Sequence, residues 1–288
     1  MTRAVAAGTA CVLLLVASGC GERSEPTGAV APLYPVTVQG AGERPAIAQS
    51  TPRRIAALGR APKAILRALG AGDRLVRLDA GLTGPVLVRA LDRVRPDLIV
   101  ATRNSDAIDL ARARTRTRAT VYVAPDSSLQ DVERSITDLG LLVDRPLSAR
   151  EIDGRIERER RAIAARLRGE PVVRAFVDTG FFATVPDHSL LGDLVREARG
   201  HSVGGPSPEP GEPFDLNRLA RLNPQVYLAT SDSGTSLASL RKNPKTRRLA
   251  AVRAGRFGVL PARLVEPGPQ VAAGLEAVAR LLHPDAFR

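Results

Sequence analysis

The chain has no tryptophan, and aromatic residues make up only 3% of its 288 residues. Few side chains are therefore present on which nucleic-acid bases could stack. The formal net charge of +12 would suit binding to phosphates, but only three of the 42 basic residues are lysine, a bias that a GC-rich coding sequence produces by itself. Together with the export signal described below, these features argue against a nucleic-acid partner. We interpret the positive charge as a solvated surface. The alternative is that it attracts anionic lipid headgroups or an anionic small ligand.

Histidine is equally scarce. Only His188, His201 and His283 are present, and their spacing is not that of zinc ligands. We therefore expect no metal site, although a haem axial ligand from His188 or Tyr227 is left open. No glycine-rich loop of a standard phosphate-binding pattern occurs either. The sequence predicts no cofactor.

Residues 1–19 have the features of a secretory signal peptide. Arg3 supplies a positive start, an apolar run covers 12–16, and small residues occupy 17–19. The run is too short for a stable membrane anchor. The ending "ASGC" looks like a bacterial lipobox, which predicts lipidation of Cys20; the alternative is an ordinary cleaved signal with an incidental thiol. Because Cys11 lies in the removed segment, one cysteine remains, and this excludes a disulfide framework.

Residues 20–51 are rich in glycine and proline, which discourage helix. We interpret them as a lipidated tether. Within it, "YPVTVQGAGERPAIA" alternates around a glycine-rich turn and predicts a small hairpin.

From residue 52 onward, short apolar runs alternate with helical patterns. In residues 52–147 the predicted strands are "RRIAALG", "RLVRLDA", "DLIVAT" and "ATVYVAP". The same alternation recurs in residues 170–288, where the predicted strands are "VVRAFVDTG", "QVYLAT" and "RFGVLP". The last predicted element is a strongly periodic helix. Such alternation predicts an α/β protein with two lobes, each containing a mostly parallel sheet covered on both faces. The length and composition predict a sizeable core.

The segment 148–169 predicts one long helix between these two units. Ser148 and Glu151 have capping-box spacing, isoleucine and leucine mark one stripe, and Gly169 ends the run. A helix of about 20 residues spans about 30 Å, the breadth of a small domain. We interpret it as a bridge.

One phrase occurs twice, as "RPDLIVAT" at 95–102 and "NPQVYLAT" at 223–230. Each copy predicts a turn through proline followed by a buried strand, at comparable places in the two units. Ligands collect beyond the carboxyl ends of strands in open α/β sheets. Two such ends facing one another would form a cleft.

The pentapeptide "GHSVG" at 200–204 has the pattern of a hydrolase nucleophile elbow, with Ser202 as nucleophile and His283 as base. The elbow needs a strand before the serine and a helix after it. Here a helical pattern precedes it and a proline-rich loop follows. We therefore do not expect an enzyme, and we interpret Gly200 as a helix cap.

Taken in order, "TPRRIAALG", "ILRALGAGDRLV", "RPDLIVA", "VYVAPDSSLQDVERSITDLGLLV", "RRLAAVRAGRFGVLP" and "EPGPQVAAGLEAVARLLHP" resemble the cobalamin and ferric-siderophore group of solute-binding lipoproteins that serve ABC importers. The resemblance runs from about Tyr34 to the C-terminus. It implies two Rossmann-like lobes joined by one long rigid helix, with the ligand held between the lobes and little hinge closure.

The strand ends and the resemblance nominate ligand-binding residues. A guanidinium can bind a carboxylate or catecholate through two parallel hydrogen bonds, although an ordinary surface role for Arg103 is the alternative. Relatives place an aromatic residue over the ligand in the segment that holds Phe181 and Phe182; the alternative is a core position. The full set is Arg103, Asn104, Phe181, Phe182, Thr230, Ser231, Arg60 and Asp79.

Several features depart from the family pattern. The tryptophan that relatives use for cobalamin is missing, and the loop after Asp79 is short, which reduces one wall of the cleft. Relatives also place a carboxylate on each lobe to dock on permease arginines, and the matching position here is Arg89, which would repel them. The resemblance therefore implies a lipid-anchored, extracytoplasmic, monomeric protein that captures an iron-siderophore, haem or corrinoid-like ligand for an ABC permease. A ligand sensor or surface lipoprotein without a permease partner is the alternative.

Overall fold

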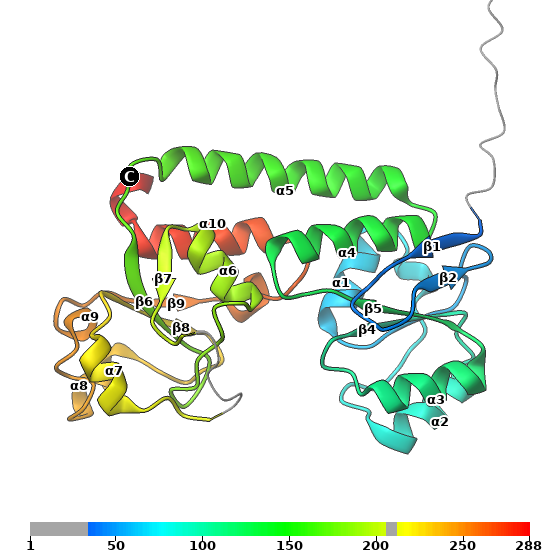
Figure 1. Cartoon of the computed structure of the whole chain (residues 1–288), viewed down its shortest axis with the longest axis horizontal. Helices are drawn as coiled ribbons and strands as arrows, with labels where there is room; N and C mark the ends of the chain where they lie inside the picture. The colour runs from blue at the N-terminus through cyan, green and yellow to red at the C-terminus, as the bar shows by residue number, and fades with distance from the viewer. Residues whose placement is uncertain (1–33, 206–211) are drawn as a thin grey trace, which may run out of the picture. The chain divides into compact units, whose positions relative to one another are not determined.

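The computed structural model describes residues 34–205 and 212–288, and residues 33–288 form one compact unit. The predicted signal peptide, Cys20 and the first part of the tether lie outside the described residues. Within the described part, two parallel sheets belong to two lobes, and one long helix connects them (Figure 1). The predicted α/β fold with two lobes is confirmed. In the part of the chain that the structure describes, no helix is both long enough and apolar enough to span a membrane.

The N-terminal lobe contains a three-stranded parallel sheet in the order β3-β4-β5. Its strands are β3 (Ile55–Ala57), β4 (Leu98–Thr102) and β5 (Thr120–Ala124). The helices are α1 (Arg60–Ala68), α2 (Gly84–Val94), α3 (Ala107–Thr117) and α4 (Leu129–Leu142), with a short 3-10 turn at Gly72–Arg74. Continuous apolar runs such as Leu98–Ala101 are buried because helices cover both faces of the sheet.

The C-terminal lobe contains a four-stranded parallel sheet in the order β7-β6-β8-β9. Its strands are β6 (Val173–Asp178), β7 (Gly200–Ser202), β8 (Val226–Thr230) and β9 (Phe257–Leu260). The helices are α6 (Leu190–Glu197), α7 (Leu216–Leu222), α8 (Leu237–Lys242), α9 (Ala250–Arg253) and α10 (Val271–Leu282), with 3-10 turns at Ala262–Leu264 and Pro284–Phe287.

The connecting helix α5 (Pro146–Arg166) has 21 residues and packs against α4 of one lobe and α10 of the other (Figure 1). The predicted capping box at Ser148 is wrong, because the helix begins earlier with Pro146 in its first turn and no side-chain cap. The approach of α4 is close: a Cβ on Gly140 would lie 2.5 Å from Cβ of Ala149. One hydrophobic cluster runs without interruption through α4, α5, α6 and α10, so the two lobes share a core.

The hairpin of β1 (Val36–Val38) and β2 (Ala46–Ala48) packs on the N-terminal lobe and is not part of a tether. Its alternate apolar residues join the shared core, and the Tyr34 hydroxyl donates to the carbonyl of Leu142 at 2.9 Å. The assignment of 20–51 as a tether is therefore corrected for residues 34–50, because burial of the hairpin's apolar face holds them against α4 and β5.

The strand predicted at 74–80 is also corrected. Only Leu75 bridges to the sheet, at Ile55, and the backbone N–H of Val76 donates to the Ile55 carbonyl at 2.9 Å. The chain then leaves the sheet edge, and Arg77 and Asp79 are exposed to solvent. At the other lobe, Gly200 begins β7 and does not cap a helix. A Cβ on it would lie 2.6 Å from side-chain atoms of Leu282 and Val195, whereas Arg199 takes the left-handed conformation.

The repeated phrase builds the same local structure twice. Arg95 and Asn223 end their helices in the left-handed conformation, with φ of 42° and 44°, and proline follows each. The next side chain accepts a backbone hydrogen bond at the start of the neighbouring strand: Asp97 from Arg54 at 3.0 Å, and Gln225 from Arg174 at 2.9 Å. The strands that follow, β4 and β8, each lie between two other strands.

Candidate functional site: a groove between the lobes

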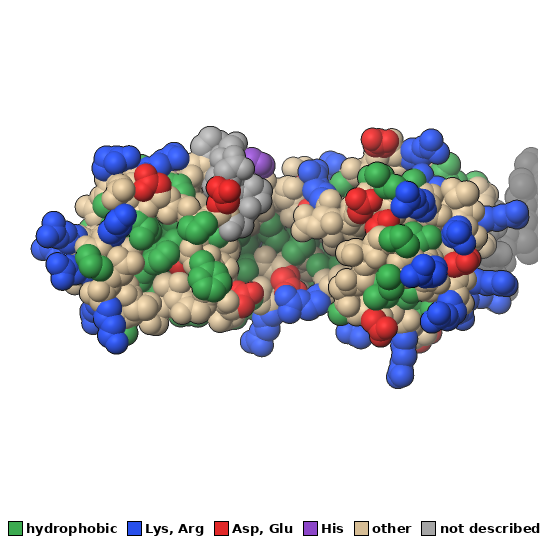
Figure 2. All heavy atoms as spheres, turned by 90° about the horizontal axis from the view of Figure 1, so that it is seen from below, with side chains coloured by type: hydrophobic (Ala, Val, Ile, Leu, Met, Phe, Trp, Pro, Cys, Tyr) green, Lys and Arg blue, Asp and Glu red, His purple; other side chains and the backbone are tan. Residues whose placement is uncertain are grey.

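A groove of about 460 Å³, the inter-lobe groove, lies at the carboxyl ends of β4 and β5. Side chains from both lobes line it, and Figure 2 shows the hollowed surface between the lobes with acidic and basic side chains at its edge. Its lining residues are Arg60, Ala61, Thr102, Arg103, Asn104, Asp126, Ser127, Ser189, Leu190, Glu266 and Pro267. The position agrees with the rule that open parallel sheets bind ligands beyond their strand ends.

A tight turn after β4 places Arg103 and Asn104 at the rim of this groove. The N–H of Ser105 donates to the Thr102 carbonyl at 3.0 Å, and the Ser105 hydroxyl accepts from the Thr102 N–H at 3.2 Å. Asp106 then caps α3, because its carboxylate accepts from the N–H of Asp109 at 2.8 Å. Arg103 and Asn104 are consequently exposed at the tip of a turn whose backbone is held on both sides.

Both arginines of the groove have a carboxylate partner. Arg60, at the start of α1, reaches Glu266 from the segment before α10, with 2.6 Å between Nη2 and Oε1. Arg103 Nε lies 3.8 Å from Oδ1 of Asp126. The Arg60 side chain is 83% exposed and that of Arg103 54% exposed, so each pair contributes at most about 1 kcal/mol. An anionic ligand group could displace either carboxylate at little energetic cost.

Burial raises the pKa of Asp126, and the nearby Arg103 guanidinium opposes part of that rise. Loss of hydration therefore destabilises the charged form of Asp126. The loose pairing with Arg103 offsets only part of that destabilisation. A ligand that takes Arg103 away from Asp126 would raise the pKa of Asp126 further.

A hydrogen bond between the lobes holds the floor of the groove. The carboxylate of Asp193, on α6, accepts from the backbone N–H of Leu129 at the start of α4, at 2.7 Å, and this contact is buried. Asp193 also pairs with Arg196. A carboxylate at a helix N-terminus is favourable because four N–H groups there lack partners within the helix. The contact resists separation of α4 from α6 directly beside Ser127 and Ser189.

A second pocket of about 330 Å³, the mouth pocket, adjoins the groove and shares Arg60, Thr102 and Asn104 with it. Asp79 lines this pocket from the short segment before α2. The pocket floor is fixed by buried Asp109, whose carboxylate accepts from the N–H of Gly84 at 2.6 Å. The structure thus brings Arg60, Asp79, Arg103 and Asn104 of the predicted set together around the groove and the mouth pocket.

The predicted residues of the C-terminal lobe line neither space. Thr230 is buried, and the Ser231 hydroxyl accepts from the N–H of Ala262 at 3.0 Å. Phe182 packs against a hydrophobic cluster of its own lobe, which is the core position left open by the sequence. Phe181 is 86% exposed, and both phenylalanines have positive φ, of 50° and 64°. Such strained conformations need support from the surrounding structure.

The turn that holds both phenylalanines is closed by the N–H of Ala183, which donates to the Gly180 carbonyl at 2.8 Å. Beside this turn lies Asp178, a fully buried carboxylate at the end of β6. It accepts hydrogen bonds from the Tyr227 hydroxyl at 2.7 Å, the Thr235 hydroxyl at 2.7 Å and the N–H of Gly180 at 2.9 Å. Burial and the Asp178 carboxylate together raise the pKa of Tyr227. Tyr227 is buried and committed to this network, which is unsuited to the haem ligation that the sequence left open.

The hydrolase pattern does not form a nucleophile elbow. Ser202 ends strand β7 and is 5% exposed, so its hydroxyl does not face solvent. His283 is also buried, and its Nδ1 lies 3.6 Å from a carboxylate oxygen of Glu170. In residues 34–205 and 212–288, no group of three histidine, cysteine or acidic residues is arranged to hold a metal ion.

Sequence reasoning missed the groove residues contributed by other segments. Asp126 lies two residues after the end of β5, and the strand-end argument applied to Arg103 would have identified it. Glu266 and Ser189 had no such signal, because only the packing of the C-terminal lobe against α4 brings them to the groove.

Comparisons with known proteins assign the chain to a family. Residues 88–264, more than half of the chain, match the family described as periplasmic binding protein, and the chain belongs to this family. It is therefore a binding protein and not an enzyme. A relative from Bacillus subtilis, named as the uncharacterized ABC transporter substrate-binding lipoprotein YvrC, is 23% identical, with 98% of each chain covered.

Solved structures share the fold. The Helicobacter pylori protein CeuE, solved with Ni(II) bound, superposes with a TM-score of 0.75 at 15% identity over 88% of this chain and 90% of that one. The vitamin B12 binding protein BtuF of Vibrio cholerae gives a TM-score of 0.71 at 17% identity over 82% of this chain and 98% of that one. At these identities the likeness shows the two-lobed architecture.

Proposed function

We propose that this protein is the substrate-binding lipoprotein of an ABC importer, and that the inter-lobe groove captures a metal chelate or corrinoid-like ligand. The observation that carries the proposal is the groove itself: it lies at the strand ends of one lobe and is also lined by residues of the other, with Arg60 and Arg103 at its rim. The name of the B. subtilis relative supports an importer and a lipid anchor. Cys20 would carry that anchor on the extracytoplasmic face of the membrane.

The size and charges of the site support a ligand of this class. The groove and the mouth pocket, of about 460 and 330 Å³, share three residues and so extend one another within the range of small-molecule sites. Two guanidinium groups can bind carboxylate or catecholate oxygens. The solved structures with Ni(II) and of a vitamin B12 binding protein point to the same range of ligands.

The test is native mass spectrometry of the form that starts after Cys20, which retains the whole compact unit of residues 33–288. The probes are cyanocobalamin, haem, and ferric catecholate and hydroxamate siderophores. We expect a one-to-one complex with one class, weakened about tenfold or more by Arg103→Ala. Arg112→Ala, an exposed arginine on α3 outside the groove, is the matched control. If none of the probes bound, or if both variants bound as wild type does, the groove assignment would be wrong.

A second candidate function is a ligand sensor or surface lipoprotein without a permease. Arg89 favours it, because this exposed residue of α2 stands where the family resemblance places a docking carboxylate. The two functions predict different effects of a gene deletion on ligand uptake. Deletion of the gene should abolish ligand uptake if the chain serves an importer, whereas a sensor would bind the ligand and leave uptake unchanged. Membrane fractionation of a Cys20→Ser variant tests the anchor separately.

A further inference from the structure

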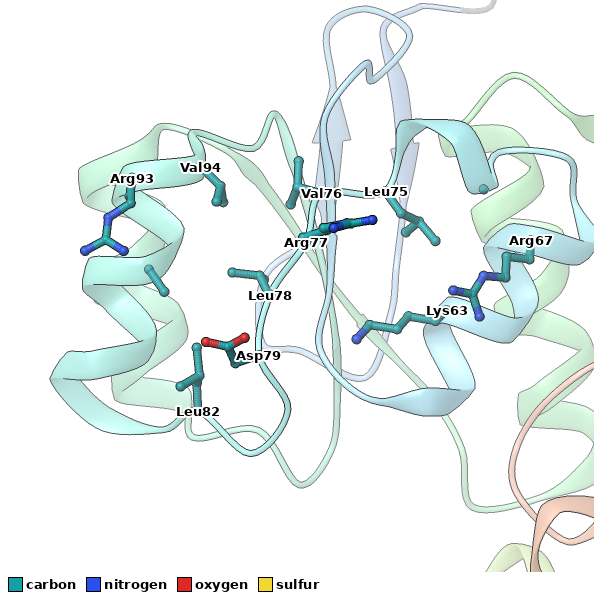
Figure 3. Close-up of a pocket in the computed structure, with 12 residues that line it drawn as sticks. Lys63, Arg67, Leu75, Val76, Arg77, Leu78, Asp79, Leu82, Arg93 and Val94 are labelled. Atoms are coloured by element: carbon teal, nitrogen blue, oxygen red, sulfur yellow. The ribbon is translucent and has the colours of Figure 1, made fainter.

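A hollow of about 500 Å³, the basic hollow, lies on the N-terminal lobe between α1, the segment 75–82 and α2 (Figure 3). Its cationic lining residues are Lys63, Arg67, Arg77 and Arg93, and Asp79 is its one acidic residue. In Figure 3, Lys63 and Arg67 extend from α1 towards the segment that carries Arg77, and the Arg77 side chain extends back towards α1. Three cations from two elements thus face one space.

In residues 34–205 and 212–288, no carboxylate pairs with these cations. Among the described residues, no ion pair and no side-chain hydrogen bond involves Lys63, Arg67 or Arg77. Other arginines of the same lobe do have partners: Arg60 pairs with Glu266, and Arg116 lies 3.5 Å from Asp92. Like charges gathered in one place repel one another, so the hollow is a region of positive potential that an anion would stabilise.

Apolar side chains also line the hollow. Leu75, Val76, Leu78 and Leu82 line it, and each is a half-buried residue packed against a core cluster. The Arg67 stem lies over Gly72, where a Cβ would come within 3.1 Å of Arg67 Cγ. These apolar side chains and the guanidinium groups together suit a molecule that carries an anionic head and a less polar body.

We propose that the basic hollow is a second binding site, and that it takes a phosphate-bearing anion, either a free phosphate compound or the headgroup of an anionic phospholipid. Two arginine forks and one lysine match the oxygens of a phosphate group better than a single carboxylate does. The site is separate from the inter-lobe groove: Arg67 and Arg77 line neither the groove nor the mouth pocket. Lys63, Leu78, Asp79 and Leu82 line both the hollow and the mouth pocket, so the two spaces are neighbours.

The test compares two double variants of the form that starts after Cys20. Arg67→Ala with Arg77→Ala removes two cations of the hollow, and Arg155→Ala with Arg158→Ala removes two exposed cations of α5 as a control of equal charge. One arm titrates inorganic pyrophosphate by calorimetry at fixed ionic strength. The other measures co-sedimentation with phosphatidylcholine vesicles that contain phosphatidylglycerol.

We expect the hollow variant to weaken binding by about tenfold or more, and the control to stay within about twofold of wild type. Binding of pyrophosphate alone would identify a soluble anion, and binding of vesicles alone a lipid headgroup. Charge reversal by Arg77→Glu should abolish either. Equal loss in both double variants, no binding of either probe, or binding only to an acidic polypeptide such as polyglutamate would overturn the proposal. Unfolding curves of the variants exclude misfolding as the cause.

Discussion

The two lobes contain similar copies of one sequence, RPDLIVAT at 95–102 and NPQVYLAT at 223–230, but the strands that these copies form end differently. In the N-terminal lobe, the turn after β4 leaves Arg103 and Asn104 exposed at the groove. In the C-terminal lobe, the segment after β8 stays paired with its neighbour: the N–H of Ser231 donates to the Leu260 carbonyl at 2.8 Å, and Thr230 is buried. The repeated residues therefore specify a scaffold, and the residues beyond them decide whether a strand end is open.

The lobes also differ in how their first strand ends. Strand β6 ends in buried Asp178, whereas β3 ends in Ala57 and is followed by Leu58 and Gly59. A buried carboxylate ties three segments of one lobe together, and the other lobe has no such residue at that place. Four predictions test these differences, beginning with the largest effect.

Asp178→Ala should destabilise the protein by about 3 kcal/mol or more, because the Tyr227 and Thr235 hydroxyls and the Gly180 N–H would lose a buried acceptor. Urea unfolding measures the change. Asp178→Asn keeps an acceptor oxygen and should cost less. A change below about 1 kcal/mol for the alanine variant would mean that the network does not hold the C-terminal lobe.

Asp193→Ala should cost about 2 kcal/mol, since the Leu129 N–H would be left buried without an acceptor. The loss should also loosen the contact between the lobes, which small-angle scattering would record as a larger radius of gyration. Asp193→Asn, which retains an acceptor, is the control. Unchanged stability together with unchanged dimensions would show that the shared core alone holds the lobes.

Arg95→Gly should stabilise the protein by about 0.5–1 kcal/mol, because the left-handed conformation is sterically unfavourable for arginine but not for glycine. Asn223→Gly should not do so. The Asn223 side chain also accepts from the N–H of Ala250 at 2.7 Å, and that bond would be lost. Thermal unfolding of both variants checks the comparison, and equal shifts would show that the two helix ends are energetically the same.

The smallest effect concerns Asp126 and pH. Burial raises the pKa of this carboxyl in the folded state, so the folded protein binds its proton more tightly than the unfolded chain does. The contribution of Asp126 to stability therefore falls as pH rises through the interval between its unfolded and folded pKa values. Asp126→Asn removes this dependence, so its stability relative to wild type should rise with pH. Urea unfolding from pH 4 to 7 tests the sign, and a fall would contradict it.

Much of the fold could be predicted from the sequence, because local patterns of apolar residues specify its strands and helices. Continuous apolar runs predicted β4 and β8, and the spacing of Ile152, Ile156 and Ile163 predicted the buried face of α5. The strand at 74–80 failed because an apolar run at a sheet edge can leave the sheet after one bridge. The hairpin was assigned to a tether because the segment is rich in proline and glycine. That composition does not reveal that the short apolar face of the hairpin packs on the core.

The site was predicted in part. Arg103 and Asn104 followed from the position of a strand end, which sequence periodicity reveals. The sequence by itself determined the alternation of strands and helices, the repeated scaffold and the family resemblance, because these depend on residues close together in the chain. Only the tertiary structure decided which strand end is open and which carboxylates meet the arginines. Glu266 and Asp193 reach their partners through packing between lobes, and such contacts between distant segments leave no local pattern.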